Sequence, residues 1–261
     1  MADKNKKGKS RLVVRLGSKL LWGFEKFIAK SSKVPTTPFL DPYQFDWVKD
    51  LEGNWEIIRA EVDRILEHKD NIPSFQDISK DQKSITTDDK WKTYFLYGFG
   101  YKAVKNCERC PETTKIIESI PGMKTAFFSI LAPGKHIPAH RGVYNGVIRC
   151  HLGIKVPEPK EKCRIRVHEV FAHWEEGKVM MFDDTYNHEV WNDTDGERVV
   201  LFMDIDRPLR FPATALNSLL IKAVQKSSFI QDAKKNQEAW EDKFEENGRQ
   251  GATKDKVESP K

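Results

Sequence analysis

The chain has 261 residues, of which 39% are hydrophobic and 32% are charged, and its formal net charge is +5. This apolar fraction is sufficient for a buried core and excludes global disorder. Four cysteines in a chain of this length do not indicate a disulfide scaffold, and neither a secretory signal nor an apolar run of about 18 residues is visible. We therefore expect a cytoplasmic protein built on one decorated domain or on a domain and a half, with no nucleic-acid partner.

Positive charge is concentrated in residues 1–31, the first segment of the chain. Residues 1–30 contain nine basic and two acidic side chains. From Leu12 onward, apolar residues recur at steps of three and four, which predicts a basic amphipathic helix with the stripe Val13, Leu16, Leu20, Phe24 and Phe27. Two interpretations remain open. Residues 10–30 contact an anionic membrane at its inner face, or the same stripe packs on the domain, for example on residues 42–68.

Residues 32–120 are expected to form a mixed, largely helical first part of the domain. Asp41 and Pro42 fit the N-cap and first position of a helix that extends to about His68. Residues 72–90 are polar and indicate a loop, and the alternating residues 91–99 indicate a strand. Cys107 and Cys110 have no second cysteine pair at zinc-finger spacing, so we expect them to be buried thiols.

Short strands dominate residues 121–212. The hydrophobic pattern and the Pro and Gly clusters between the apolar segments predict strands at 125–132, 148–156, 163–170, 178–182, 189–192 and 198–204. Strands this closely spaced favour a sandwich or jelly roll over an alternating α/β sheet. The fold class is therefore mainly β, with a helix expected at 213–247 and a polar tail at 248–261.

Two histidines and an arginine have the spacing of a metal site with a bound dicarboxylate. His140 follows a Pro-Gly turn, His188 lies 48 residues later, and Arg198 lies 10 residues beyond His188. Oxygenase iron binds neutral imidazoles and keeps positions open for a chelating co-substrate and O2. A guanidinium on the next strand can bind the distal carboxylate of that co-substrate through two hydrogen bonds. This layout is typical of 2-oxoglutarate-dependent oxygenases.

Several motifs occur in a fixed order between residues 124 and 208. They are HRG at 140–142, IRCHLG at 148–153, WEEGK at 174–178, FDD at 182–184 and HEVW at 188–191, followed by Arg198. In this order they resemble the aspartyl/asparaginyl β-hydroxylase family. The segments SKVPTTPFL at 32–40, SIPGMK at 119–124 and DIDRPL at 204–209, with the aromatic residues of 91–97, are similar to its bacterial lipid branch, the lipid A 2-hydroxylases.

The resemblance implies a double-stranded β-helix (jelly-roll) core flanked by N- and C-terminal helices. It also implies Fe(II) bound by His140 and His188, with O2 as oxidant. The residues that it places around the co-substrate 2-oxoglutarate are Ser129, Arg149, His151 and Arg198.

Gly142 stands where many oxygenases carry a third, carboxylate ligand. The resemblance implies a water molecule at that coordination position, with Asp184 as a candidate partner for it. Arg149 and His151 alternate on one strand and therefore share a face. They contact either the anionic co-substrate or a structural hydrogen-bond network, and Ser129 is either a co-substrate ligand or an ordinary strand residue.

The substrate that the resemblance favours is a fatty acyl chain of a membrane lipid, of the lipid A or ornithine-lipid type. The basic amphipathic N-terminus supports this interpretation. The alternatives are β-hydroxylation of Asp or Asn in a protein, a small-molecule substrate, and a jelly-roll binding module without catalytic activity. Retention of His140, His188 and Arg198 argues against the last.

Overall fold

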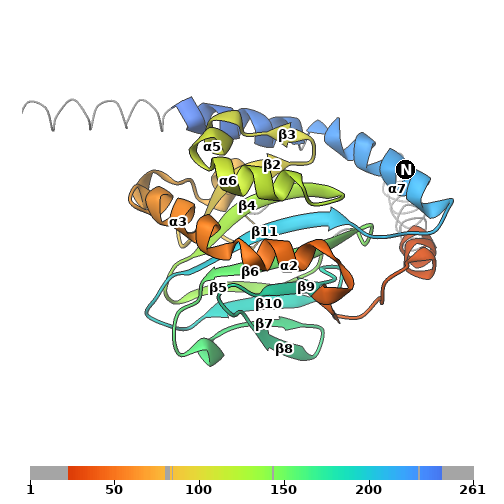
Figure 1. Cartoon of the computed structure of the whole chain (residues 1–261), viewed down its shortest axis with the longest axis horizontal. Helices are drawn as coiled ribbons and strands as arrows, with labels where there is room; N and C mark the ends of the chain where they lie inside the picture. The colour runs from red at the N-terminus through yellow and green to blue at the C-terminus, as the bar shows by residue number, and fades with distance from the viewer. Residues whose placement is uncertain (1–22, 80–82, 84, 143, 229, 243–261) are drawn as a thin grey trace, which may run out of the picture.

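Two antiparallel sheets lie face to face in the computed structural model, which describes residues 23–79, 83, 85–142, 144–228 and 230–242 (Figure 1). The major sheet has the order β1 (Phe39–Leu40), β9 (Val179–Phe182), β6 (Val147–Lys155), β11 (Arg198–Asp206), β4 (Met123–Leu131), β2 (Trp91–Gly98) and β3 (Tyr101–Lys102). The minor sheet has the order β5 (Lys135–His140), β10 (His188–Asn192), β7 (Cys163–Val167) and β8 (Val170–His173). The predicted mainly β, jelly-roll fold is confirmed.

The two sheets differ in how many of their faces are buried. In β7, Ile165 and Val167 are fully buried while Arg164 and Arg166 between them are partly exposed, as expected of a sheet with one solvent face. In β11, the consecutive residues 199–201 are all 0% exposed. The major sheet is therefore covered on both faces, and this explains its continuous apolar runs.

Helices cover the outer face of the major sheet (Figure 1). They are α2 (Trp47–Gly53), α3 (Trp55–Leu66), α5 (Val104–Arg109) and α6 (Pro111–Glu118). The other short helices are η1 (Pro42–Gln44), η2 (Lys69–Asn71), α4 (Phe75–Ile78) and η4 (Lys160–Lys162), of which η4 contacts β7 of the minor sheet. Helix α7 (Ala213–Gln225) packs on residues 23–31, and residues 230–242 are also helical. Buried thiols of Cys107 and Cys110 lie in the helical layer, as expected. None of the helices within the described ranges is long and apolar enough to span a bilayer.

The single helix expected at 42–68 is wrong, because the chain leaves the helical conformation at Phe45, where φ is −111° and ψ is 113°, and again at Asn54. There the backbone leaves the helical region, with φ −106° and ψ 10°, and the side-chain amide donates to the Asp50 carbonyl at 2.7 Å. This bond satisfies a carbonyl of the last turn of α2 that a continuing helix would have used, so α3 starts in a new direction.

Two strand predictions also need correction. The expected strand 163–170 is two strands, β7 and β8, because the chain turns at His168, where φ is +56°. Strand β5 was not predicted, since it contains Pro138. The proline is tolerated because β5 is the edge of the minor sheet.

The loop expected at 72–90 contains the short helix α4, and the C-terminal helix is interrupted after Gln225. Residues 243–261 lie outside the described part.

Residues 23–31 form a helix that packs on the domain. Ile28 is 0% exposed and contacts Leu209 and Ala213. Phe24 stacks on Tyr144 with ring centroids 6.0 Å apart. For these residues the packing interpretation holds, although the helix lies against the segment after β11 and not against 42–68. Residues 1–22, which carry most of the predicted membrane-binding stripe, lie outside the described residues.

A buried ion pair fixes the turn between β9 and β10. Arg207 is 2% and Asp183 3% exposed, and the guanidinium donates to the Asp183 carboxylate and, at 2.6 Å, to the Asn145 carbonyl. The other carboxylate oxygen of Asp183 accepts from the Thr185 backbone amide at 3.1 Å. Because Asp184 is in this turn and His188 follows it as the first residue of β10, the ion pair sets the positions of both.

Asp183→Asn is expected to lower the free energy of unfolding by about 3 kcal/mol, since it leaves a buried guanidinium without its counter-charge. Asp193→Asn is the control. It breaks the ion pair with Arg164, whose two side chains are 29% and 47% exposed, and is expected to cost less than about 1 kcal/mol. Urea unfolding followed by circular dichroism measures both, and equal losses would contradict the structural role of Asp183.

Candidate active site

The two candidate metal ligands face each other across neighbouring strands. His188, the first residue of β10, pairs with His140, the last residue of β5, and their ring centroids are 4.1 Å apart. Each Nδ1 lies against a backbone carbonyl, that of Pro138 at 2.9 Å for His140 and that of Tyr186 at 3.0 Å for His188. A carbonyl can only accept, so Nδ1 carries the hydrogen in both rings and Nε2 carries the lone pair that a metal requires.

Both rings are neutral at physiological pH. Burial lowers the pKa of His140. The hydrogen bond to the Pro138 carbonyl opposes this effect, and the Arg149 charge adds a smaller lowering. Burial, His140 and Arg149 together lower the pKa of His188 to about 3. A metal competes with protons for imidazole, so a site whose ligands are already deprotonated binds metal without that penalty.

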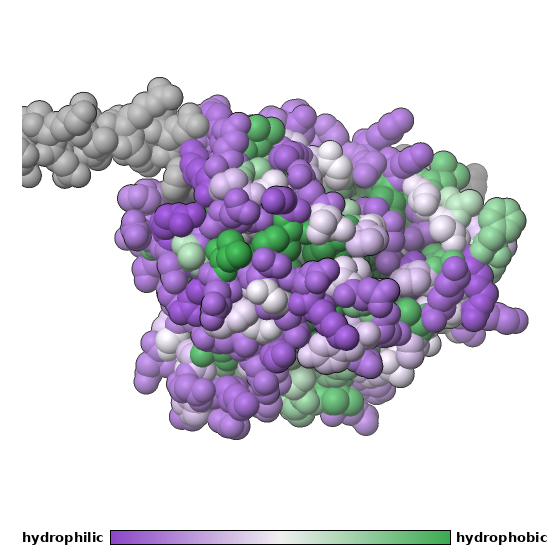
Figure 2. Space-filling model, viewed as in Figure 1, coloured by the Kyte–Doolittle hydropathy of each residue, from purple (hydrophilic) through white to green (hydrophobic). Residues whose placement is uncertain are grey.

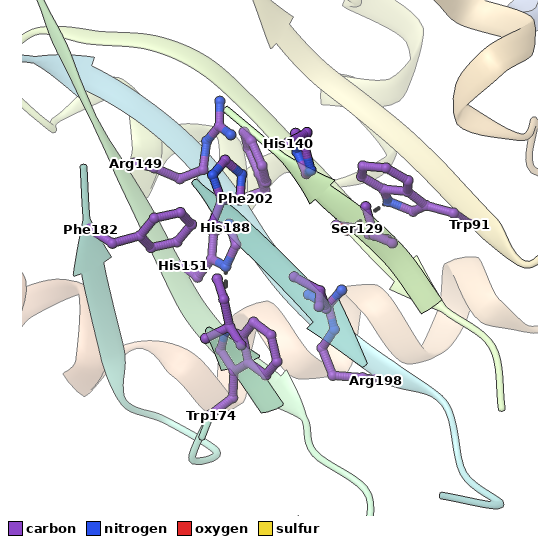
Figure 3. A pocket seen from close by; sticks show the side chains of 13 residues that line it. Trp91, Ser129, His140, Arg149, His151, Trp174, Phe182, His188, Arg198 and Phe202 are labelled. Atoms are coloured by element: carbon purple, nitrogen blue, oxygen red, sulfur yellow. Dashed lines mark hydrogen bonds between the residues drawn. The ribbon is translucent and has the colours of Figure 1, made fainter. Parts of the chain in front are cut away.

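His151 has the opposite tautomer. Trp174 donates from Nε1 to His151 Nδ1 at 3.2 Å, which leaves the hydrogen of the neutral ring on Nε2 (Figure 3). Burial, together with Arg198 and Arg149, lowers the pKa of His151 well below its usual value. Its Nε2 is buried and has no hydrogen-bond partner within the described ranges. His151 therefore presents a hydrogen-bond donor to the pocket, not a metal ligand.

Arg198 closes one end of the pocket. Its side chain is 2% exposed and lies 4.6 Å over the Trp174 ring, while Nε and Nη1 have no hydrogen-bond partner among the residues that the structure describes. Burial lowers the pKa of Arg198 to about 10, so the guanidinium still carries its charge at neutral pH. A buried cation without an anion is costly, and these donors are therefore matched to an anionic ligand.

Ser129 lies on the same face of the sheet as Arg198. It pairs with Val200, two residues after Arg198, and its Oγ accepts from Trp91 Nε1 at 3.0 Å. Because that bond uses a lone pair, the hydroxyl hydrogen remains available to a ligand. Ser129 and Arg198 can thus donate to the same anion.

Arg149 lies at the opposite end of the pocket from Arg198, with the histidines between them (Figure 3). Its guanidinium forms ion pairs with Asp184 at 3.0 Å and Asp204 at 3.1 Å, and lies 4.4 Å over the Phe202 ring. Burial is opposed here by the two carboxylates, which raise the pKa of Arg149.

The Asp184 carboxylate occupies the space beside Gly142. A Cβ on Gly142 would lie 2.2 Å from Asp184 Oδ2, and the Gly142 amide donates to the Asp184 carbonyl at 2.7 Å. Burial, opposed by Arg149, raises the pKa of Asp184 to about 6. Its Oδ1 has no partner in the described part of the chain. A third ligand carried by residue 142 is thus sterically excluded, and a carboxylate from the turn between β9 and β10 occupies that space.

All six site residues expected from the sequence line this one pocket: Ser129, His140, Arg149, His151, His188 and Arg198. Their roles stay predictions. Sequence reasoning missed Trp91, Trp174 and Phe202, which orient the polar groups. Trp174 occurs within one of the matched motifs, which was the available signal. Of the remaining histidines, His136 and His168 are exposed and lie outside the pocket.

Two features define the class to which the chain belongs. One is the jelly-roll fold, and the other is a pocket that brings together two facing histidines and a buried arginine without an ion-pair partner among the described residues. Residues 52–208, more than half of the chain, match the family model described as Aspartyl/Asparaginyl beta-hydroxylase. The chain is 47% identical to the ornithine lipid ester-linked acyl 2-hydroxylase of Rhizobium tropici, over 84% of this chain and 78% of that protein. The chain belongs to the aspartyl/asparaginyl β-hydroxylase family, a family of hydroxylases.

Two further similarities are more distant. The human aspartyl/asparaginyl beta-hydroxylase is 33% identical over 62% of this chain, which spans only 21% of the human protein. A solved prolyl-4-hydroxylase from Pseudomonas putida has 15% identity and a TM-score of 0.37, over 59% of this chain and 87% of that one.

Gly142→Ala is expected to lower the free energy of unfolding by about 1–3 kcal/mol, because the added methyl overlaps the Asp184 carboxylate. Gly53→Ala is the control, since nothing lies within 4 Å of a Cβ there. Thermal unfolding measures both variants. In an Asp184→Ala background the cost of Gly142→Ala should largely disappear, and an unchanged cost would show that the overlap is not the cause.

Proposed function

We propose that this protein is an Fe(II)- and 2-oxoglutarate-dependent dioxygenase that hydroxylates C2 of an ester-linked acyl chain in a membrane lipid of the ornithine-lipid type. The observation that carries the proposal is the buried guanidinium of Arg198, whose Nε and Nη1 have no partner among the described residues, in one pocket with two neutral histidines whose Nε2 lone pairs are available. The 47% identical relative is named for this reaction, which supports the choice of substrate.

The donor set fits Fe(II). His140 and His188 would bind it through Nε2, and the backbone carbonyls at each Nδ1 hold both rings in position. Two protein ligands leave room for a chelating co-substrate and O2. When bound, Fe(II) with 2-oxoglutarate and O2 would supply the oxidising power to hydroxylate an unactivated C–H bond.

The other end of the pocket fits a dicarboxylate. Nε and Nη1 of Arg198 have no hydrogen-bond partner among the described residues, so this planar guanidinium keeps charged donors for a carboxylate. Ser129 and His151 would add one neutral donor each. Burial of these groups between the sheets keeps water from competing for them. A co-substrate contact of Arg149 also stays part of the proposal.

Asp184 would act on the metal site without binding the metal. Its Oδ1, which has no partner among the described residues, would accept a hydrogen bond from a water ligand of Fe(II), and Arg149 holds the carboxylate in position through Oδ2. A carboxylate that does not bind the metal does not neutralise part of the metal's positive charge. The metal site therefore has a higher affinity for anionic 2-oxoglutarate.

The alternative substrate is an Asp or Asn residue of a protein, as the name of the human relative suggests. The human relative is less identical to this chain than the lipid hydroxylase is, and its match covers a smaller part of the chain. A binding module without catalysis would have no use for a buried arginine without an anion, because such a charge destabilises the fold.

The full-length protein, supplied with Fe(II), 2-oxoglutarate and ornithine lipid in detergent micelles, should form succinate and a lipid heavier by one oxygen atom. Tandem mass spectrometry should place that atom on C2 of the ester-linked chain. His140→Ala and His188→Ala should abolish both products, because each removes one of two protein ligands.

His136→Ala is the matched control, since this exposed histidine on β5 bonds to Glu189 at 2.8 Å, outside the pocket, and should leave turnover unchanged. An Asp-containing peptide tests the alternative substrate. Hydroxylation of the peptide but not of the lipid would overturn the lipid assignment, and full succinate formation by both histidine variants would overturn the iron assignment.

Arg198→Ala is expected to raise the KM for 2-oxoglutarate about a hundredfold, because it removes a charge-assisted two-bond contact. Arg198→Lys should restore part of the affinity, since a point charge does not reproduce the planar pair of donors. Arg198→Met should unfold no more easily than wild type when 2-oxoglutarate is absent, since the charge it removes has no partner. Arg164→Ala, on the solvent face of β7, is the control. An unchanged KM would exclude the assigned role.

A further inference from the structure

Helix α7 presents an apolar face to solvent. Ala213, Asn217 and Ile221, at steps of four, are its buried residues, whereas Leu216 and Leu219 are 41% and 65% exposed. Phe211 precedes the helix and is 86% exposed, and Phe27 on the adjacent helix 23–31 is 37% exposed. We call Phe27, Phe211, Leu216 and Leu219 the α7 surface. Figure 2 shows hydrophobic side chains at the right-hand edge of the molecule, over α7 and the adjacent helix of Figure 1.

The charges around the α7 surface are almost all positive. Residues 208–226 contain three basic side chains, Arg210, Lys222 and Lys226, and no acidic one. Helix 23–31 adds Lys26 and Lys30, and its one acid, Glu25, is paired with Arg141 at 3.1 Å. Exposed aromatic and leucine side chains within a basic border are the features of a surface that binds anionic lipid.

The α7 surface lies at the far end of β11 from Arg198. Arg198 is the first residue of this strand, where β11 pairs with Leu131 of β4, and the chain that leaves its last residue, Asp206, leads into α7. Both helices of the α7 surface also contact residues between His140 and β6. Glu25 binds Arg141, and the Asn217 amide donates to the Gly146 carbonyl at 3.0 Å. The α7 surface therefore adjoins the segment that follows the candidate metal ligand His140, away from Arg198.

We propose that the α7 surface is where the protein rests on an anionic lipid bilayer. The inference rests on the proposed function, because C2 of an ester-linked chain lies next to the ester, at the headgroup boundary. To reach that carbon the enzyme needs to insert only a few side chains to a depth of about 5–10 Å. Phe211 and Leu219 are the two most exposed members of the surface and enter the bilayer first.

The test compares the full-length protein with a Phe211→Ser/Leu219→Ser variant. The probes are vesicles of phosphatidylcholine with 30% phosphatidylglycerol and vesicles of phosphatidylcholine alone, in a co-sedimentation assay. Wild type should bind the anionic vesicles, more weakly as salt rises, and the variant should lose about tenfold or more in affinity. Ile57→Ser/Val104→Ser is the control. These residues are 45% and 54% exposed on α3 and α5, and the control should bind as wild type does.

Each alternative to a lipid bilayer as the partner of the α7 surface predicts a different experimental result. If the variant binds vesicles as tightly as wild type, another part of the chain, such as residues 10–22, makes the contact and the inference is overturned. If wild type sediments as a dimer and the variant as a monomer, the surface binds a second copy, which also overturns it. If the melting temperature falls in the variant and not in the control, the chain itself covers the surface, and the inference is again overturned.

Activity in detergent micelles separates this inference from the proposed function. The Phe211→Ser/Leu219→Ser variant should hydroxylate lipid in micelles at the wild-type rate and lose most of its rate on lipid in vesicles. Vesicle binding without hydroxylation in micelles would overturn the proposed function and leave the proposed membrane contact standing. Hydroxylation in micelles without vesicle binding would overturn the proposed membrane contact and leave the proposed function standing.

Discussion

The positive charge of Arg198 sits in the closed end of a pocket where the protein supplies it with no ion-pair partner among the described residues. A charge in that position costs several kcal/mol, which the face of the Trp174 ring offsets only in part. It is tolerated because β11 lies in the middle of the major sheet, held by β6 on one side and β4 on the other. The rigid sheet thus holds an unsatisfied donor group in place, and an anion that binds there offsets the free-energy cost of burying the charge.

The three histidines of the pocket show how neighbours assign chemical roles to identical side chains. Carbonyl oxygens fix the hydrogen of His140 and His188 on Nδ1, and the indole of Trp174 fixes that of His151 on Nε2. All three have lowered pKa values because they are buried. Two are therefore prepared to bind a metal and the third to donate to an anion. The division of roles requires no change of protonation when ligands enter.

The sequence predicted the strands and the histidine pair because these depend on local pattern and on motif order. What it left out depends on contacts between distant segments. Strand β5 contains Pro138, and only its place at a sheet edge makes it a strand. That the Asp184 carboxylate fills the space beside Gly142 follows from the pairing of β5 with β10. Similarly, the partners of Arg149 include Asp204, 55 residues away, which no motif connects to it.

Strand β11 relates the two ends of the proposed reaction path. Its first residue, Arg198, lies at the closed end, and the chain that leaves its last residue, Asp206, leads directly into the α7 surface. Nine residues of strand at about 3.3 Å each measure roughly 30 Å, so the anion site and the proposed membrane contact lie well apart. A charged co-substrate at the closed end is thereby kept away from the anionic surface that would repel it. The lipid needs to bring only one carbon of its chain past Arg149 to the histidines, while its headgroup stays outside among basic side chains.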